Sequence, residues 1–241
     1  DDYFYPYRVF PGDPGYDEKV GKGKFMPFPD AATFAKYGAQ DGFRADQVAD
    51  WRRHNVDLLI EAISRTVKRL KPWVKFGVSP GGVWRNRADD PAGSDTMDGN
   101  PCYDALFANV RLWVRKGWID YNAPQLYNVI GDAESDYKTL IRWWSANNAG
   151  ANLYIGQYVR HTVRCARPGH PGTFEDQFPA KMALLRTDPN ISGLYWWQGY
   201  EIPLNPDGFT DALVRDYQAH IVLTPRYPNL DVVPPCPVEN L

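Results

Sequence analysis

Apolar residues along this chain alternate between a spacing typical of helices and short continuous runs typical of buried strands. The clearest helical pattern covers residues 46–70, where apolar side chains recur every three or four positions at Val48, Trp51, Val56, Leu59, Ile60, Ile63 and Val67. Asp46 is a suitable N-cap, and Pro72 ends the helix. The apolar run 73–78 that follows predicts a buried strand.

The same alternation continues to about residue 222. Helices are predicted over 103–116, from Asp132 or Ser135 to Trp144, over 173–186 with a break or kink at Pro179, and over 210–222. Strands are predicted within 117–128, over 152–157 and over 191–198. Strand-helix alternation implies parallel strands joined by right-handed crossovers, so the predicted fold class is α/β. With five strand exits, the chain is expected to form strands 4 to 8 of a (β/α)8 barrel of the TIM type.

The two ends of the chain differ from this pattern. Residues 1–7 resemble the exit of a strand whose body precedes the chain, and a long loop rich in Gly, Pro and aromatic residues continues to about Ala45. Such a composition is typical of a lid or cleft wall. Residues 223–241 are rich in Pro and predict an extended linker toward a further module, which leaves 1–222 as the barrel domain.

Composition excludes several classes of function. A net charge of -2 provides no basic excess for nucleic acid. No apolar run reaches the ~18 residues of a membrane span, and no signal peptide is visible. Three widely spaced cysteines and four dispersed histidines suggest no metal site, and no Gly-rich phosphate loop follows a strand, so no cofactor is expected.

Polar and aromatic side chains gather where the predicted strands end, which is where ligands bind in parallel α/β folds. The candidates for substrate binding are Ser79, Trp84, Arg85, Gln125, Tyr127, Asn128, Gln157, Tyr158, Trp196 and Trp197. Amides exchange hydrogen bonds with hydroxyl groups and indoles stack on sugar rings, so this set favours a carbohydrate ligand. Asp120 lies five residues before Gln125, roughly 16 Å away along a strand, and is assigned to the structural end.

Glycoside hydrolysis usually requires two carboxyl groups. Asp1 or Asp2 could supply one, and because adjacent strand residues point to opposite faces, only one of them should face the site. The same rule makes one of Trp196 and Trp197 a core residue. Glu201 could supply the second carboxyl, and a partner on strands outside the chain is an equal alternative. A non-catalytic carbohydrate-binding protein is the alternative function, and a metal-dependent hydrolase is disfavoured because ligand clusters are lacking.

Several motifs together resemble the glycosyl hydrolase-like 10 family of bacterial (β/α)8-barrel proteins. They are the stretches 1–6 (DDYFYP), 51–56 (WRRHNV), 71–80 (KPWVKFGVSP), 117–121 (GWIDY), 123–127 (APQLY) and 153–157 (LYIGQ). The resemblance implies that the Asp-Asp-Tyr stretch ends the fourth barrel strand and carries the best catalytic candidates. It also implies an exported glycoside hydrolase of the cell envelope, outside the cytoplasm, that acts on a polysaccharide such as peptide-free glycan strands of peptidoglycan. This chain alone is expected to be inactive, because the first three strands would be missing.

Overall fold

Four parallel strands form one sheet in the part of the chain that the computed structural model describes, residues 1–20, 24–164 and 172–218. The strands are β1 (Gly77–Val78), β2 (Tyr121–Asn122), β3 (Asn152–Tyr158) and β4 (Ile191–Trp197), and they are neighbours in chain order. Each pairs in parallel with the next, from Gly77 beside Tyr121 to Tyr158 beside Trp197. This order is the one that consecutive strand-helix units adopt in a barrel. The α/β class is confirmed, and the sheet is consistent with part of a (β/α)8 barrel.

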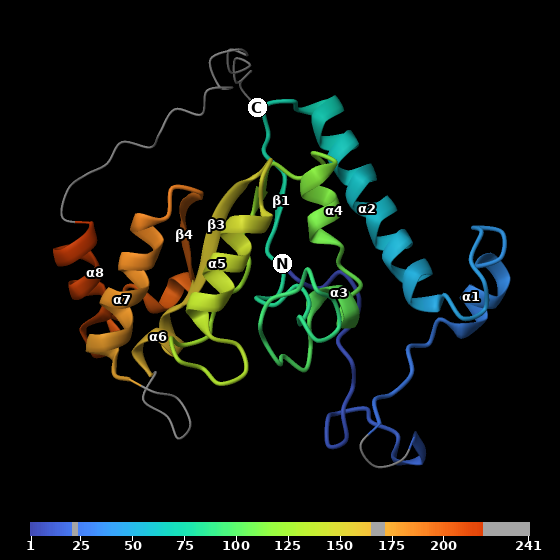
Figure 1. Ribbon diagram of the computed structural model, residues 1–241, viewed down its shortest axis with the longest axis horizontal. Helices are drawn as coiled ribbons and strands as arrows, with labels where there is room; N and C mark the ends of the chain where they lie inside the picture. The colour runs from blue at the N-terminus through green and yellow to red at the C-terminus, as the bar shows by residue number, and fades with distance from the viewer. Residues whose placement is uncertain (21–23, 165–171, 219–241) are drawn as a thin grey trace, which may run out of the picture.

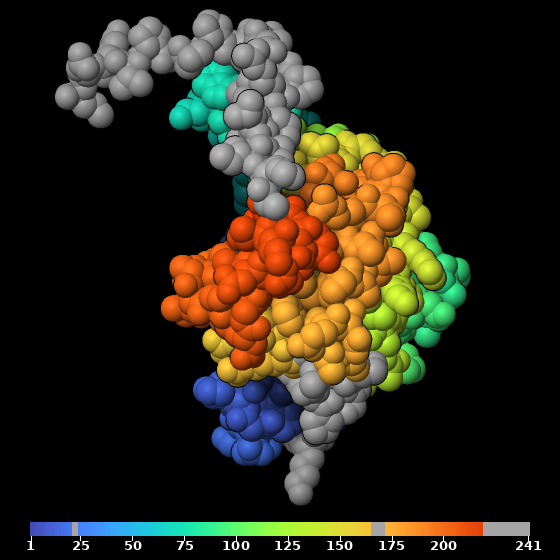
Figure 2. All heavy atoms as spheres, turned by 90° about the vertical axis from the view of Figure 1, so that its left-hand side faces the viewer, coloured from blue at the N-terminus to red at the C-terminus, as the bar shows by residue number. Residues whose placement is uncertain are grey.

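Helices connect the strands and cover one face of the sheet. The helices are α1 (Ala31–Tyr37), α2 (Val48–Leu70), α3 (Cys102–Ala105), α4 (Val110–Arg115), α5 (Tyr137–Asn147), α6 (Val159–Val163), α7 (Phe174–Thr187) and α8 (Phe209–Tyr217), with short 3-10 turns η1 (Glu18–Val20), η2 (Gly199–Glu201) and η3 (Pro206–Gly208). Figure 1 shows α5 in front of the sheet, with α4 and α7 on either side of it. Figure 2 shows α7 and α8 side by side at the β4 end of the molecule, with the N-terminal segment projecting below.

The hydrophobic core lies between the sheet and these helices. Leu153 and Ile155 of β3 pack in one cluster with Leu140 and Trp144 of α5 and with Trp113 of α4. These side chains are almost completely buried. Because successive strand residues point to opposite faces, the residues between them on β3 face away from the helices. That second face is where the candidate site lies.

Several predicted boundaries differ from the structure. The helix predicted over 103–116 is divided into α3 and α4, because Phe107 between them adopts a positive φ of 54°, outside the helical region. The third helix is capped by Asp136, whose carboxylate accepts a hydrogen bond from the Thr139 amide, and not by Asp132 or Ser135. α7 continues through Pro179, its sixth residue. No helix is predicted directly after the strand 152–157, where the structure has α6.

Other predictions concern the ends of the chain. Residues 1–7 form neither strand nor helix, so the predicted strand exit is an irregular segment beside the sheet. The predicted linker, residues 223–241, lies outside the described residues, as do Cys165 and Cys236. Cys102 is a free, buried thiol. None of the described helices combines the length and the apolar character needed to cross a membrane.

Asp120 lies at the amino end of β2, as predicted, and joins three segments there. Its Oδ2 atom accepts hydrogen bonds from Lys68 Nζ at 2.6 Å and from the Phe76 backbone amide at 2.7 Å. Lys75 Nζ is 3.9 Å from Oδ1. The carboxylate therefore fixes the end of α2 and the start of β1 against β2, far from the ends of the strands where ligands bind.

Asp120→Ala is expected to lower the free energy of unfolding by about 1–3 kcal/mol, because a charged acceptor is lost and the Phe76 amide is left unpaired. Urea unfolding would measure this loss, and ligand binding should not change. Asp95→Ala is the control, because Asp95 makes an exposed ion pair with Arg87 at 3.6 Å and should have little effect. Equal stability of the Asp120 variant and the parent would contradict a structural role.

Asp57 of α2 is a second carboxylate that contributes to the structure and lies outside the candidate site. Trp113 Nε1 donates a hydrogen bond to its Oδ1 at 2.5 Å. Burial raises the pKa of Asp57 to about 6, and this effect outweighs the Trp113 hydrogen bond and the charges of His54 and Arg53, which lower the pKa. The folded protein therefore holds the proton more tightly than the unfolded chain does.

Asp57 should make stability fall as pH rises. Its favourable contribution is complete below about pH 4, the pKa of an unfolded Asp, and is lost as pH rises through about 6. Between pH 4 and pH 7 the free energy of unfolding of the parent should fall by about 1–2 kcal/mol relative to that of Asp57→Asn. The effect is kept to this size because Asp57 is partly exposed and solvent screens its charge. A difference between the two proteins that does not vary with pH would refute the shift.

Candidate active site

A cleft of about 530 Å³ opens on the face of the sheet that the helices leave uncovered. Its lining residues come from the N-terminal segment, the exits of β1 and β2, and the strands β3 and β4. They are Asp1, Asp2, Tyr3, Tyr7, Ser79, Tyr121, Ala123, Gln125, Tyr127, Gly156, Tyr195, Trp196 and Trp197. Aromatic rings, amides and carboxylates therefore meet at one place, as the sequence predicted for the strand exits.

Strand alternation decides which residues line this cleft. Tyr121, Ala123, Gln125 and Tyr127 all face it from the β2 segment, whereas Leu126 between them is completely buried in the core. Tyr195 and Trp197 likewise face the cleft from β4, with 49% and 46% of their surface exposed. The period of two along these segments is that of an extended chain with alternate side chains on opposite faces.

Asp1 and Asp2 both line the cleft. The expectation that only one of them would do so assumed a strand, and residues 1–7 are not in one. Gln125 Nε2 donates a hydrogen bond to Asp1 Oδ1 at 3.2 Å and another to the Ser79 carbonyl at 3.0 Å. The Gln125 amide therefore links the N-terminal segment to the exits of β1 and β2.

Asp2 is the more buried of the two carboxylates, with 6% of its surface exposed, and the Tyr7 hydroxyl donates a hydrogen bond to its Oδ2. Burial and this hydrogen bond raise the pKa of Tyr7, so the hydroxyl keeps its proton and remains a donor. The Asp2 backbone amide donates to Asp1 Oδ1 at 3.1 Å. The Asp2 carboxylate is thus oriented by Tyr7, and the Asp1 carboxylate by Gln125.

Aromatic rings from the β2 and β4 exits meet in the same cleft as the aspartates. The Tyr127 and Trp197 rings stack with centroids 5.6 Å apart and an interplanar angle of 12°. Tyr158 does not line the cleft itself but supports both rings, at 5.5 Å and 4.5 Å between centroids. Burial, followed by the negative charge of Asp2, raises the pKa of Tyr127 to about 12. We refer to Tyr127, Tyr158 and Trp197 as the aromatic wall.

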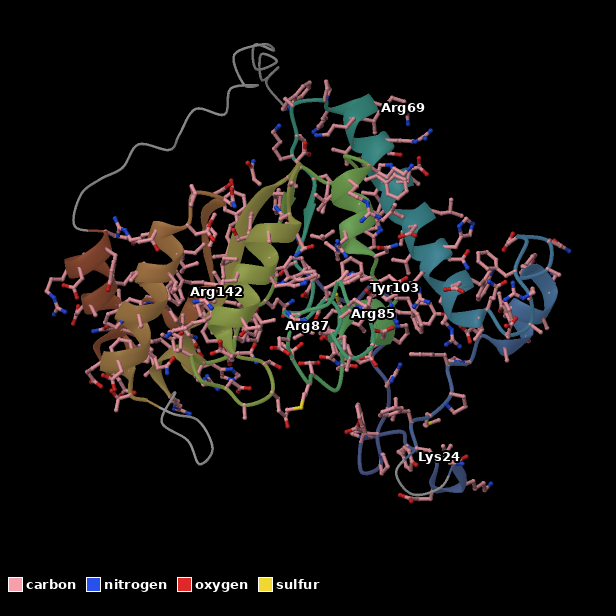
Figure 3. The ribbon with its side chains drawn as sticks, viewed as in Figure 1. Lys24, Arg69, Arg85, Arg87, Tyr103 and Arg142 are labelled. Carbon is pink, nitrogen blue, oxygen red and sulfur yellow. The ribbon has the colours of Figure 1, made fainter. Side chains whose placement is uncertain are left out.

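Trp84 and Arg85 do not reach the cleft. Trp84 is buried in the core, where its ring stacks on Trp143 with centroids 5.5 Å apart. Arg85 forms ion pairs with Asp90 and Asp104 at 3.1 Å and 2.9 Å. Its guanidinium lies 4.7 Å from the centroid of the Tyr103 ring, and both residues are labelled in Figure 3. The loop after β1 turns away from the sheet, so the structure assigns these two predicted binding residues to packing and ion pairing.

Gln157 and Asn128 are also placed away from the cleft. Gln157 is 1% exposed and donates to the Tyr137 hydroxyl of α5, on the helix side of the sheet. Asn128 is not among the residues that line the cleft, and its backbone carbonyl accepts a hydrogen bond from Lys181 Nζ of α7 at 2.6 Å. Strand alternation explains Gln157, because Gly156 is the cleft-facing neighbour.

Glu201 is separated from the two aspartates. It lines a different, smaller pocket, where Arg160 Nη2 lies 2.7 Å from its Oε1 atom. The structure therefore does not bring Glu201 together with Asp1 and Asp2, and it does not favour the predicted role of second carboxylate. Trp196 packs its ring against Phe209 and Phe178, at centroid distances of 4.8 Å and 6.0 Å, on the core side. Trp196 also borders the cleft, but Trp197 is the member of the pair whose ring is largely exposed there.

Several cleft residues were missed by the sequence analysis, namely Tyr3, Tyr7, Tyr121, Ala123, Gly156 and Tyr195. Four of them carry a readable signal, because each lies on the same face as a predicted exit residue: Ala123 and Tyr121 lie two and four residues before Gln125, Gly156 lies two before Tyr158, and Tyr195 lies two before Trp197. Counting back by twos from the predicted exits would have found all four. Tyr7 carries no such signal, since its position depends on the path of an irregular segment. Among the described residues, no group of three or more acidic, His or Cys side chains is arranged to hold a metal ion.

Comparison with known proteins identifies the family of this chain. The sequence model of the family described as Glycosyl hydrolase-like 10 matches residues 1–168. The chain belongs to the glycosyl hydrolase-like 10 family. A family member from Bacillus subtilis (strain 168), glycosyl hydrolase YngK, is 38% identical over 237 residues, which cover 98% of this chain and 43% of YngK. Glycosyl hydrolase DigH of Escherichia coli (strain K12) is 45% identical over 129 residues, 53% of this chain and 28% of DigH.

Two consequences follow for a member of the glycosyl hydrolase-like 10 family. The family implies a TIM barrel, which agrees with the parallel sheet observed here. The chain spans less than half the length of the curated relatives it matches, so the activity of a whole protein of this family goes beyond what this chain displays.

Tyr7→Phe is expected to lower kcat for glycan cleavage by about 10-fold or more, because a hydrogen bond to a charged group contributes about 1.5–3 kcal/mol. The assay uses a full-length protein that contains this chain. Tyr3→Phe is the matched control, since Tyr3 also lines the cleft but is 72% exposed. Thermal unfolding of both variants separates an effect on Asp2 from a loss of folding. Equal rates for the two variants would show that the Tyr7 hydroxyl does not assist Asp2.

Proposed function

We propose that this chain supplies one wall of the active site of a glycoside hydrolase that cleaves O-glycosyl bonds in a bacterial polysaccharide. The observation that carries the proposal is the convergence of two carboxylates, Asp1 and Asp2, with the stacked Tyr127–Trp197 pair in one cleft. Membership of the glycosyl hydrolase-like 10 family and relatives named glycosyl hydrolases support it.

In the proposed reaction, water adds across the bond between the anomeric carbon and the leaving oxygen. One carboxyl group protonates the leaving oxygen, and a carboxylate attacks the anomeric carbon or activates the water. Asp2 is the better candidate for the reacting carboxylate, because it is buried and oriented by the Tyr7 hydroxyl. Asp1, held by Gln125 at the open side of the cleft, is positioned to act with it.

The aromatic wall would bind the sugar. A pyranose ring presents C–H groups on its flat face, and these pack against an aromatic plane such as Trp197. Gln125 can both donate to and accept from sugar hydroxyl groups. The proposed substrate is a cell-envelope polysaccharide, with peptide-free glycan strands of peptidoglycan as the specific candidate, and the proposed location is outside the cytoplasm.

The test is the release of reducing ends from purified polysaccharides by a full-length protein that contains this chain. Peptide-free glycan strands should be cleaved, and intact peptidoglycan with its peptides should be cleaved more slowly if the candidate substrate is correct. Binding of these glycans without release of reducing ends would instead support a non-catalytic carbohydrate-binding protein. Recovery of the protein in the cytoplasmic fraction would contradict the proposed location.

A further inference from the structure

The charged side chains that line the cleft are both negative. Asp1 and Asp2 are the charged side chains among its described lining residues, and the other lining side chains are aromatic, uncharged polar or small. Tyr121, Tyr127, Tyr195 and Trp197 present rings, while Ser79 and Gln125 offer neutral hydrogen-bonding groups. A ligand in this cleft therefore meets two carboxylates and, among the described lining residues, no guanidinium, ammonium or imidazole side chain.

The basic side chains around the sheet are engaged elsewhere. Arg160 pairs with Glu201, and Lys181 donates to the Asn128 carbonyl on the helix side. Lys68 and Lys75 lie with Asp120 at the amino end of the strands.

Two further arginines, Arg87 and Arg142, line a separate cleft of about 360 Å³ between the loop after β1 and α5 (Figure 3). His161 packs on Tyr158 with ring centroids 4.4 Å apart, but it does not line the candidate active site.

We propose that the sugar residue held by this wall is uncharged or amine-bearing, and that the wall discriminates against a carboxylated sugar such as a uronic acid. The inference rests on the proposed function. A carboxylate on the ligand would lie near two like charges with no described cation to compensate, and such repulsion is strongest where water is partly excluded. In a polymer that alternates neutral and carboxylated residues, the neutral residue would therefore occupy the position against Trp197.

The inference is tested by titrating the chain with four β-1,4-linked tetramers that share ring and linkage, built from glucose, glucuronic acid, N-acetylglucosamine and glucosamine. The titration is run at pH 8, where imidazole is neutral, with the α-amino group of Asp1 acetylated to remove its charge. The glucuronic acid tetramer should bind about tenfold more weakly than its glucose counterpart at low salt. Glucosamine should bind at least as well as N-acetylglucosamine, and added salt should narrow the difference between the glucuronic acid and glucose tetramers.

A charge-introducing variant keeps the test specific. Tyr195 is half exposed in the cleft, so Tyr195→Arg should fold and should restore binding of the glucuronic acid tetramer, whereas the matched neutral variant Tyr195→Gln should not. Equal or tighter binding of glucuronic acid by the unmodified chain would overturn the inference and leave the proposed function standing. Failure of all four tetramers to bind would contradict the proposed binding of sugar by the aromatic wall.

Discussion

Replacing Asp2 by asparagine is expected to lower glycan cleavage about a thousandfold while glycan binding remains within a few-fold of the parent. Asparagine keeps the size of the side chain and can still accept the hydrogen bond from the Tyr7 hydroxyl. It loses the negative charge and the ability to transfer a proton, which are the properties that hydrolysis uses. Binding depends mainly on the aromatic wall, which the substitution does not touch.

The measurement is the release of reducing ends together with a titration of an oligosaccharide, both on a full-length protein that contains this chain. Asp1→Asn should also abolish cleavage with binding preserved, because Asp1 is the second carboxyl group of the cleft. Asp120→Asn serves as the comparison, since that carboxylate lies at the opposite end of β2 and should affect stability alone. Full activity in both Asp2→Asn and Asp1→Asn would move the chemistry to other residues.

The order of helices and strands could be predicted because it depends on local patterns. The 46–70 helix was recovered as Val48–Leu70, since its apolar face and the proline after it are both visible in the sequence. The division of the 103–116 helix was not visible, because it follows from the backbone of one buried residue, Phe107, packed against Tyr5 and Phe28. Contacts with a distant segment override local propensity at such a position.

The candidate site was predicted in part. Treating every residue at a strand exit as a binding residue placed Gln125, Tyr127 and Trp197 correctly in the cleft, but it also included Gln157, which faces the helices. The period of two along a strand would have shown from the sequence that Gln157 faces away from the cleft. Arg85 and Glu201 could not have been excluded from the sequence alone, because their partners Asp104 and Arg160 come from other segments brought together only by folding.

The two adjacent tryptophans of β4 offer the clearest separation of binding from stability. Trp197 is 46% exposed and stacks on Tyr127 at the cleft, whereas the Trp196 ring contacts Phe178 and Phe209 on the core side. Their side chains point to opposite faces because they are neighbours in a strand. The same substitution at the two positions should therefore have different consequences.

Trp197→Ala is expected to weaken glycan binding by about 1–3 kcal/mol, by analogy with aromatic stacking on other flat ligands, and to change stability little. Trp196→Ala should instead lower the free energy of unfolding by roughly 3–5 kcal/mol, because it leaves a cavity beside Phe209. Oligosaccharide titration and thermal unfolding of both variants measure the two effects, each variant being the control for the other. If Trp197→Ala binds every oligosaccharide as tightly as the parent does, the aromatic wall does not hold the sugar. The stacked Tyr127–Trp197 pair would then be a packing feature only.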